Sequence, residues 1–333
     1  FRERGRKKWL IFAIMDRFDV TILGCGSATP TLRHHPAAQA INYRDRVMLV
    51  DCGEGTQLQM RRYSIPFSRI TDIFISHLHG DHCLGLPGLL STLSLQDHPG
   101  PVTVHMPAQG IDIFSRMIEF FSPGVARNVE LKAIPDGIKV IAETKGLEVV
   151  AFPLYHRMPC HGFIFREKKR QRTLLGDKAD MLGIPHSLRP AIKGGADWRR
   201  PSDGRIFTNA ELTTDPPAPM SYAYCSDTLA DERVAKAIAG VDVVYHEATY
   251  LDDMANQAKE RGHSTAAQAA RIAARAGAGS LVIGHYSKRY HQPDALAAEA
   301  AKIFPGPVIA ADEGMVIEIF NARRARAQEL PTP

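Results

Sequence analysis

The chain has 333 residues, 44% hydrophobic and 23% charged, which suits one large globular α/β domain or two smaller ones. Its five cysteines are an odd number without a CxxC pair, so neither a disulfide framework nor a cysteine zinc site is implied, and a reducing cytoplasm is the expected compartment. The net charge of +5 divides into +4 over residues 1–9, +6 over 166–205 and −5 elsewhere. A localised basic segment is typical of a polyanion-binding site, and a solvated loop without a partner is the alternative.

The first residues are expected to lie outside the fold. Residues 1–14 combine a basic start with part of the apolar run WLIFAIM (9–15), which is too short to span a membrane. No small-residue cleavage site follows it, as would be typical of a signal peptide. We therefore interpret residues 1–14 as an N-terminal extension, and no other stretch of the sequence is a candidate membrane span.

Short runs rich in Val and Ile alternate with helix-like stretches over the remaining chain, a pattern typical of an α/β fold. The runs predicted as strands are 19–24, 46–51, 70–76, 101–106, 147–152, 221–226, 241–246, 279–285 and 315–320. The stretches predicted as helices are 54–64, 84–96, 108–120, 264–277 and 294–304.

Residues 166–219 interrupt this alternation. They hold six prolines, several glycines and most of the excess positive charge, which indicates an inserted arm rather than core. We predict a main domain over 15–322 that carries this arm, followed by a C-terminal tail over 323–333.

The strongest chemical signal is the run SHLHGDH (76–82), at the end of the strand predicted over 70–76. Neutral imidazole nitrogens and carboxylate oxygens are zinc ligands. A tight loop at the end of a strand can direct His77 and His79 to one metal ion, and Asp81 and His82 to a second. A cluster of surface histidines is the alternative interpretation.

One loop cannot complete two metal sites, so further ligands must follow other strands. His156, Asp227 and His285 each stand at or just after the end of a predicted strand. Taken singly, a histidine in this position is usually a hydrogen-bonded loop residue, and Asp227 could be a helix N-cap. Their order along the chain is the informative feature.

The order HxHxDH, His, Asp, His resembles that of the metal ligands in the metallo-β-lactamase superfamily. The resemblance implies a four-layer αβ/βα sandwich of two similar halves, with the metals at one edge between the sheets. The ligands implied for one zinc ion are His77, His79 and His156, those for the second are Asp81, His82 and His285, and Asp227 bridges both.

Several short motifs resemble the ribonuclease Z family within this superfamily, and HEAT and HST are the most discriminating. The motifs are LGCGSATPT (23–31), DCGEGTQLQ (51–59), FISHLHGDHCLGLPGLL (74–90), PLYHRMPCHGF (153–163), YCSDT (224–228), HEATY (246–250), GHSTAAQAA (262–270) and GHYSKRY (284–290). The resemblance implies a cytoplasmic endoribonuclease with two zinc ions per subunit, which removes the 3′ trailer from precursor tRNA and leaves a 3′-hydroxyl. A hydroxide that bridges the two metals is the implied nucleophile.

The resemblance also implies a partner and an assembly. The basic arm lies between the third and fourth ligand motifs, where bacterial members carry a tRNA-binding exosite. It implies a homodimer, because relatives use the arm of one subunit on the tRNA that the other subunit cleaves. Three features depart from the family: the loop PTLRHH (30–35) lacks its Lys, Arg and Asn, Ser226 stands where Gly is common, and the arm segment GIPHSLRP (183–190) lacks a Gly-Pro-rich tip.

Three residues are assigned roles in the reaction. Asp81 orients the nucleophile and accepts its proton, and His263 donates a proton to the leaving 3′-oxygen. Glu247 orients His263 or a ligand histidine. The residues alone allow other interpretations, since GHSTAAQ (262–268) also fits a simple capped helix start with a capping box at Thr265, and Glu247 fits an ordinary surface glutamate.

Two other functions fit parts of the sequence. The first is a small-molecule hydrolase of the same superfamily, such as a glyoxalase II-like thioesterase, an arylsulfatase or a phosphodiesterase. HEAT, HST and the long basic arm argue against it, because a small substrate needs a closed pocket. The second is an RNA-binding relative without catalysis, against which the complete ligand set argues.

Overall fold

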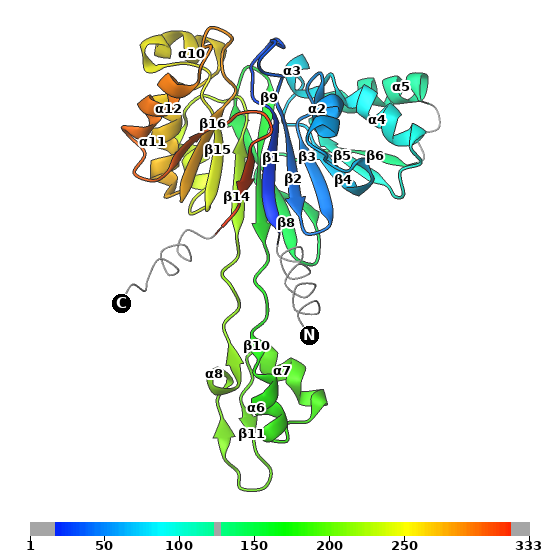
Figure 1. Cartoon of the computed structure of the whole chain (residues 1–333), viewed down its shortest axis with the longest axis vertical. Helices are drawn as coiled ribbons and strands as arrows, with labels where there is room; N and C mark the ends of the chain where they lie inside the picture. Colours follow the sequence, from blue (N-terminus) through cyan, green and yellow to red (C-terminus); the bar gives the residue numbers. More distant parts are fainter. Residues whose placement is uncertain (1–16, 123–127, 321–333) are drawn as a thin grey trace, which may run out of the picture.

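Two seven-stranded sheets form the centre of the molecule in the computed structural model, which describes residues 17–122 and 128–320 (Figure 1). Helices cover the outer side of each sheet, so that the layers follow the order helix, sheet, sheet, helix. The predicted extension 1–14 and tail 323–333 lie outside the described residues.

The first sheet has the strand order β18-β1-β2-β3-β4-β5-β6. Its strands are β1 (Phe18–Gly24), β2 (Ala38–Tyr43), β3 (Arg46–Val50), β4 (Ile70–Phe74), β5 (Val102–Met106), β6 (Val129–Ala133) and β18 (Val316–Glu318). Its helices are α2 (Thr56–Arg62), α3 (Gly80–Cys83), α4 (Leu86–Leu95) and α5 (Ile111–Phe121). Strands β3 to β6 are parallel, so the segments that follow β3 and β4 begin at the same edge.

The second sheet has the order β17-β16-β15-β14-β9-β8-β7. Its strands are β7 (Lys139–Glu143), β8 (Leu147–Tyr155), β9 (Pro159–Glu167), β14 (Ser221–Cys225), β15 (Val243–Glu247), β16 (Ser280–Gly284) and β17 (Val308–Ala310). Its helices are α9 (Glu232–Ala237), α10 (Ala255–Arg261), α11 (Ala266–Ala276) and α12 (Asp294–Ala301). The parallel run β14 to β17 again brings the carboxyl ends of neighbouring strands together.

The main core lies between the two sheets, where aromatic side chains such as Phe74, Phe152 and Phe163 are fully buried. A second cluster packs between the first sheet and its helices. Every residue of β1, β14 and β16 is buried. A strand that is covered on both faces needs apolar residues at most positions, and this explains why the sequences of these strands are largely apolar.

The segment between β9 and β14 extends away from the sandwich as an arm (Figure 1). Its elements are β10 (Thr173–Leu174), α6 (Gly176–Met181), α7 (Arg189–Lys193), β11 (Trp198–Arg199), β12 (Ile206–Phe207), α8 (Asn209–Leu212) and β13 (Thr213–Thr214). A small core of its own holds them together: Ala179, Ile184, Ile192, Trp198, Phe207 and Leu212. The arm is therefore a folded unit that leaves the sandwich after Glu167 and rejoins it at Ser221.

Within the described ranges, no helix combines the length and apolar character needed to cross a bilayer. The five cysteines are buried and unpaired, as the sequence indicated.

Candidate metal centre and active site

The seven predicted ligands converge at one edge of the sandwich, although they come from four separate segments. His77 and His79 follow β4, Asp81 and His82 lie in α3, and the others follow β8, β14 and β16. Their donor atoms form two groups, each with its atoms within 4.8 Å of one another. The groups are His77, His79, His156 and Asp227, and Asp81, His82 and His285.

In the first group, three imidazole nitrogens face one another. Nδ1 of His79 lies 3.0 Å from Nε2 of His77 and 3.2 Å from Nε2 of His156. Oδ2 of Asp227 lies 3.6 Å from the first of these Nε2 atoms and 3.8 Å from the second. The four atoms enclose a space that suits a single cation.

The second group has the same character. Nε2 of His82 and Nε2 of His285 are 3.3 Å apart, and Oδ2 of Asp81 is 3.5 Å from each. Oδ1 of Asp227 lies 3.1 Å from Nε2 of His285 and 3.5 Å from Nε2 of His82. Asp227 therefore directs one carboxylate oxygen to each group, as a bridging ligand must.

The outward nitrogens of two ligand histidines donate to strong acceptors. Nδ1 of His156 lies 2.7 Å from the carbonyl oxygen of Gly262, and Nδ1 of His82 lies 2.7 Å from Oδ2 of Asp51. A proton on Nδ1 leaves the lone pair of Nε2 directed into the site. Such partners on the outer nitrogen orient metal-binding histidines and fix the tautomer.

Two hydroxyls have the same effect on His77 and His285. Ser76 Oγ donates to Asp51 and Thr249 Oγ1 donates to Glu247, at 3.0 and 2.7 Å. Each hydroxyl can therefore accept from the Nδ1–H of its histidine, 3.1 Å away in both cases. In the neutral tautomer that this hydrogen bond favours, Nε2 of each ring again carries an inward lone pair.

The site fits a metal centre on the observations of this structure alone. Oδ1 of Asp227 is buried without a hydrogen-bond partner, because the nearby ring nitrogen of His285 is not placed to donate to it. Burial lowers the pKa of His77, His79 and His156, which favours the neutral form that binds metals. Imidazole nitrogens and carboxylate oxygens that converge in this way form an arrangement that a metal cation stabilises.

Charge in the second group supports the same conclusion. Burial by itself lowers the pKa of His82, but the carboxylates of Asp51, Asp227 and Asp81 outweigh it and raise that pKa well above its usual value. The position therefore attracts positive charge, which either a proton or a metal cation can supply.

Asp51 is a site residue that the sequence analysis did not single out. It is fully buried and accepts hydrogen bonds from the backbone N–H of Ser76 at 2.8 Å and from Tyr224 at 2.7 Å, besides those from His82 and Ser76 Oγ. Its φ of 57° is rare for a non-glycine residue. The sequence feature that could have indicated its role is the position of this carboxylate directly after strand β3. Strand β3 pairs in parallel with β4, the strand that leads to His77.

Ser226 joins this network. Its hydroxyl lies 2.9 Å from Ser76 Oγ, and both residues are buried. Because Ser76 also contacts Asp51 and His77, the Ser226 hydroxyl links the loop of Asp227 to the loop of the HxHxDH motif.

His263 stands beside the second group and is held by Glu247. Nδ1 of His263 lies 3.0 Å from Oε1 of Glu247, which is fully buried rather than on the surface. Glu247 also accepts from the backbone N–H groups of Thr228, Thr249 and Ser264, at 3.0–3.1 Å. Burial opposes a charge on His263, but Glu247 and Asp227 raise its pKa to about 9.

The predicted capping box is present at the start of α11. Thr265 Oγ1 accepts from the backbone N–H of Gln268, and the Gln268 side chain accepts from that of Thr265. The helix start thus fixes the direction of the chain immediately after His263.

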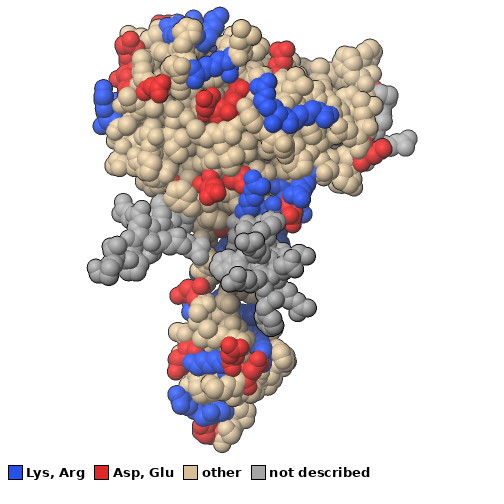
Figure 2. All heavy atoms as spheres, in the orientation of Figure 1, with Lys and Arg blue, Asp and Glu red and all other residues tan. Residues whose placement is uncertain are grey.

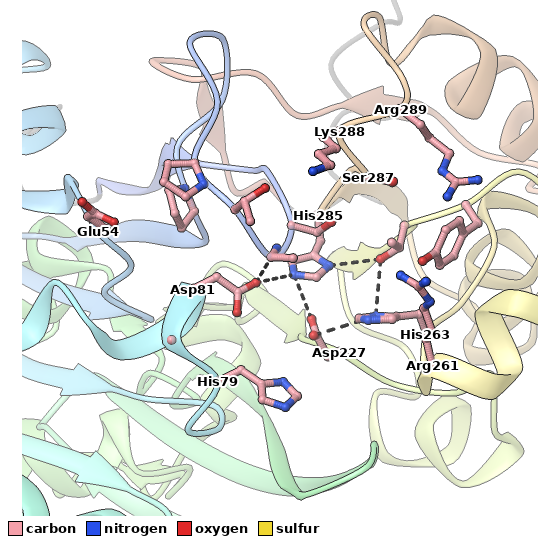
Figure 3. Close-up of a pocket in the computed structure, with 18 of the residues that line it drawn as sticks. Glu54, His79, Asp81, Asp227, Arg261, His263, His285, Ser287, Lys288 and Arg289 are labelled. Carbon is pink, nitrogen blue, oxygen red and sulfur yellow. Dashed lines mark hydrogen bonds and ion pairs between the residues drawn. The ribbon is translucent and has the colours of Figure 1, made fainter.

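Above the ligand groups lies an open cleft of about 630 Å3. His79, Asp81, Asp227, His263 and His285 form its floor (Figure 3). Its walls carry the cations Arg157, Arg261, Lys288 and Arg289, together with the carboxylate of Glu54. Arginine and lysine side chains in such positions can bind the phosphate or carboxylate groups of an anionic ligand.

Comparisons with known proteins agree with this geometry. The chain is 44% identical to ribonuclease Z from Parabacteroides distasonis and 46% identical to that from Porphyromonas gingivalis, over 92% of its own length and all of theirs. A family model described as anti-Pycsar protein Apyc1 matches residues 18–111.

Solved structures show the same fold. The short form of human tRNase Z aligns with a TM-score of 0.64 and 26% identity, over 91% of this chain and 99% of its own. The metallo-β-lactamase fold protein YhfI from Bacillus subtilis aligns with a TM-score of 0.66 and 18% identity, over 91% and 100%. The two-sheet sandwich and its histidine–aspartate edge define a protein of the metallo-β-lactamase fold, which confirms the predicted fold class.

Within that class, the sequence identity to ribonuclease Z over nearly the whole chain determines the family. The chain belongs to the ribonuclease Z family, as the HEAT and HST motifs indicated.

Proposed function

We propose that the protein is a zinc-dependent endoribonuclease that removes the 3′ trailer from precursor tRNA and leaves a 3′-hydroxyl. The proposal rests on the sequence identity with ribonuclease Z over 92% of the chain, combined with the convergence of the donor atoms of all seven predicted metal ligands. The cations on the cleft walls suit an RNA backbone. A small-molecule hydrolase has no evident use for the extended basic arm.

Two zinc ions per subunit are the proposed cofactors. His77, His79 and His156 would hold the first ion and Asp81, His82 and His285 the second, with Asp227 contributing to both. When bound, the two ions supply Lewis acidity to the attacking water and to the scissile phosphate.

The chain's own residues then position the water and move two protons. The backbone N–H of Ala28 donates to Oδ2 of Asp81 at 2.7 Å, which fixes the carboxylate at the cleft floor. From there Asp81 orients the attacking water and accepts its proton. His263 gives its proton to the departing 3′-oxygen, and Glu247 keeps the imidazole in place through Nδ1.

Zinc content tests the cofactor proposal. We expect about two zinc ions per chain in protein purified without chelators, because the seven ligand side chains supply two complete sets of donors. Elemental analysis of the purified protein measures this directly. Absence of any stoichiometric transition metal contradicts the proposal.

Cleavage of a 3′-extended tRNA tests the activity. The zinc-loaded protein is incubated with the precursor, and both products are mapped to the nucleotide. We expect one cut at the end of the tRNA body, a 3′-hydroxyl on the tRNA and a 5′-phosphate on the trailer. Hydrolysis of small esters without any cleavage of the precursor supports the small-molecule alternative instead.

We propose the arm as the surface that binds the body of the tRNA. On the face seen in Figure 2, basic and acidic side chains alternate along it. Several cations are paired, as Arg172 is with Asp215 and Arg189 with Asp180. Lys193 has no carboxylate within ion-pair distance among the described residues. It lines a groove of about 670 Å3 with both arginines.

Deletion of the arm separates binding from chemistry. Arg166 and Ser221 are paired neighbours on β9 and β14, so a short turn can replace residues 168–220 without opening the sheet. We expect the truncated protein to keep both zinc ions and to hydrolyse bis(p-nitrophenyl) phosphate, because the ligands lie elsewhere. Precursor tRNA should bind more weakly, with a shallower dependence of log K on log salt.

The outcomes of this deletion are distinct. Unchanged tRNA affinity and salt dependence contradict the proposed role of the arm and indicate a solvated segment. Loss of the metals along with both activities shows that the arm is needed for the fold of the sandwich.

The remaining proposals are a homodimer and a cytoplasmic location. Both are supported by family membership, and the location also by the nature of the substrate. Light scattering at assay concentrations measures the assembly.

A further inference from the structure

We infer that the active-site cleft is polarised by charge, so that a basic wall binds the RNA 5′ to the cut and an acidic, apolar wall receives the 3′ trailer. This inference rests on the proposed function and extends it to the orientation of the substrate.

The basic wall is built around His263. The ring of Tyr250 lies 6.2 Å from that imidazole, and the Arg289 guanidinium lies 5.5 Å from the centroid of the same tyrosine. Arg261 precedes His263 by two residues, and Arg157 packs so closely against Gly262 that a Cβ there would lie 3.3 Å from its Cγ. Arg261 and Arg289, which are labelled in Figure 3, lie on this side of the cleft.

These cations are available to a ligand. Arg157, Arg261 and Arg289 are exposed. No carboxylate of residues 17–122 or 128–320 lies within ion-pair distance of them, and the same is true of Lys288, which is also exposed. Exposed guanidinium and ammonium groups without counterions are the usual contacts of nucleic-acid phosphates.

The opposite wall is built around Asp81. The loop at Ala28 donates to this carboxylate, and the backbone of Gly53 lies so close that a Cβ there would be 2.5 Å from the Asp81 carbonyl oxygen. Glu54 follows directly and is exposed, without an ion-pair partner in the described part of the chain. Leu84, 63% exposed, continues the wall. In Figure 3, Glu54 lies beyond Asp81, on the side away from His263.

The chemistry of the reaction assigns one RNA segment to each wall. The 3′-oxygen that leaves belongs to the nucleotide 5′ of the cut, and it must reach the proton of His263. That segment therefore lies along the basic wall. The nucleotide after the cut keeps the phosphate, and it extends away from His263 over the wall of Pro30, Glu54 and Leu84.

The charges then predict how affinity is distributed. Phosphates 5′ to the cut meet cations, whereas phosphates of the trailer meet an unpaired carboxylate and apolar side chains. The trailer should add little to the affinity, so its length and sequence should matter little for binding. Glu54 is the residue proposed to keep the trailer weakly bound, because its carboxylate repels the phosphates of the trailer.

Binding measurements test this polarity with three ligands. They are the tRNA product that ends at the cut, without CCA, and two precursors with a non-hydrolysable scissile linkage, bearing trailers of one and of eight nucleotides. In the zinc-loaded protein, all three should bind within about threefold of one another, with equal salt dependence. In Glu54→Lys, the eight-nucleotide trailer should bind about tenfold tighter, with a slope steeper by about 0.7, the value for one single-strand phosphate contact.

Arg261→Gln is the matched control on the other wall. It should weaken all three ligands by a similar factor, because the segment that it contacts is common to them. The inference is overturned if the unaltered protein binds the precursor with the eight-nucleotide trailer at least about tenfold tighter than the tRNA product that ends at the cut. It is also overturned if Glu54→Lys strengthens all three ligands equally. Failure of the proposed function is a separate result, seen as no cleavage of the unmodified precursor.

Discussion

Asp81→Ala is expected to abolish cleavage of precursor tRNA, lowering the rate by at least about 10⁴-fold, as removal of a central catalytic group does. The side chain has two roles that no neighbour can replace. Its Oδ2 lies 3.5 Å from the inward nitrogens of His82 and His285, which makes it part of the second ligand group. It also stands at the cleft floor, where it can accept the proton of the attacking water.

Single-turnover rates and zinc content measure the two roles together. We expect Asp81→Ala to hold the second zinc ion weakly. Asp72→Ala is the matched control, because that carboxylate contacts His105 on the same sheet and is not among the ligand groups. Retention of both zinc ions with only a mild loss of rate would contradict the assignment of Asp81 as a ligand and proton acceptor.

The interior of the fold could be predicted because its strands are covered on both faces. The predictions over 19–24, 46–51 and 279–285 match β1, β3 and β16 to within one or two residues, since continuous apolar runs mark such strands. The runs 147–152 and 221–226 match β8 and β14 for the same reason, although β8 continues to Tyr155.

Other strands were missed because their sequences lack that signal. Strands β6 and β7 are largely exposed edge strands of five residues each, and their apolar residues form no run long enough to mark a buried strand. Strand β2 is buried but contains Gln39 and Asn42, whose polarity is accommodated by tertiary partners such as Asp19 and Tyr222. A local pattern cannot show a partner that lies far along the chain.

In the candidate site, too, the residues marked by a sequence motif could be predicted, whereas those that depend on distant contacts could not. The HxHxDH motif is local, and His156 and Asp227 were proposed because their order after that motif resembles the order of metal ligands in a known superfamily. The role of Asp51 depends on the parallel pairing of β3 with β4, which the sequence does not reveal. The burial of Glu247 depends on contacts with two other loops, so the sequence alone could not separate it from a surface glutamate.

The net positive charge of the arm could be predicted from the sequence, but the pairing of its cations with carboxylates could not. The sequence gives an excess of basic residues, whereas the structure pairs Arg200 with Asp203 as well as Arg172 with Asp215. Residue counts therefore overstate how many cations are free to bind a phosphate, and the deletion measures their combined effect.

His263→Ala is expected to slow the cleavage step by about 10²–10⁴-fold, the usual contribution of a general acid, with both zinc ions retained. The imidazole is fixed through Nδ1 by Glu247 and lines the cleft, so its other nitrogen can reach the leaving 3′-oxygen. Single-turnover rates at saturating precursor tRNA, together with elemental analysis, measure the two parts of this expectation.

The leaving group distinguishes a proton donor from a metal ligand. Because p-nitrophenolate departs without needing a proton, hydrolysis of bis(p-nitrophenyl) phosphate should be far less affected by His263→Ala than cleavage of precursor tRNA. The role of metal ligand has to be tested because the donor atoms of His263, Asp227 and His285 also lie within 4.8 Å of one another. If the variant loses a zinc ion and hydrolyses both substrates equally poorly, His263 is a ligand, and another group must protonate the 3′-oxygen.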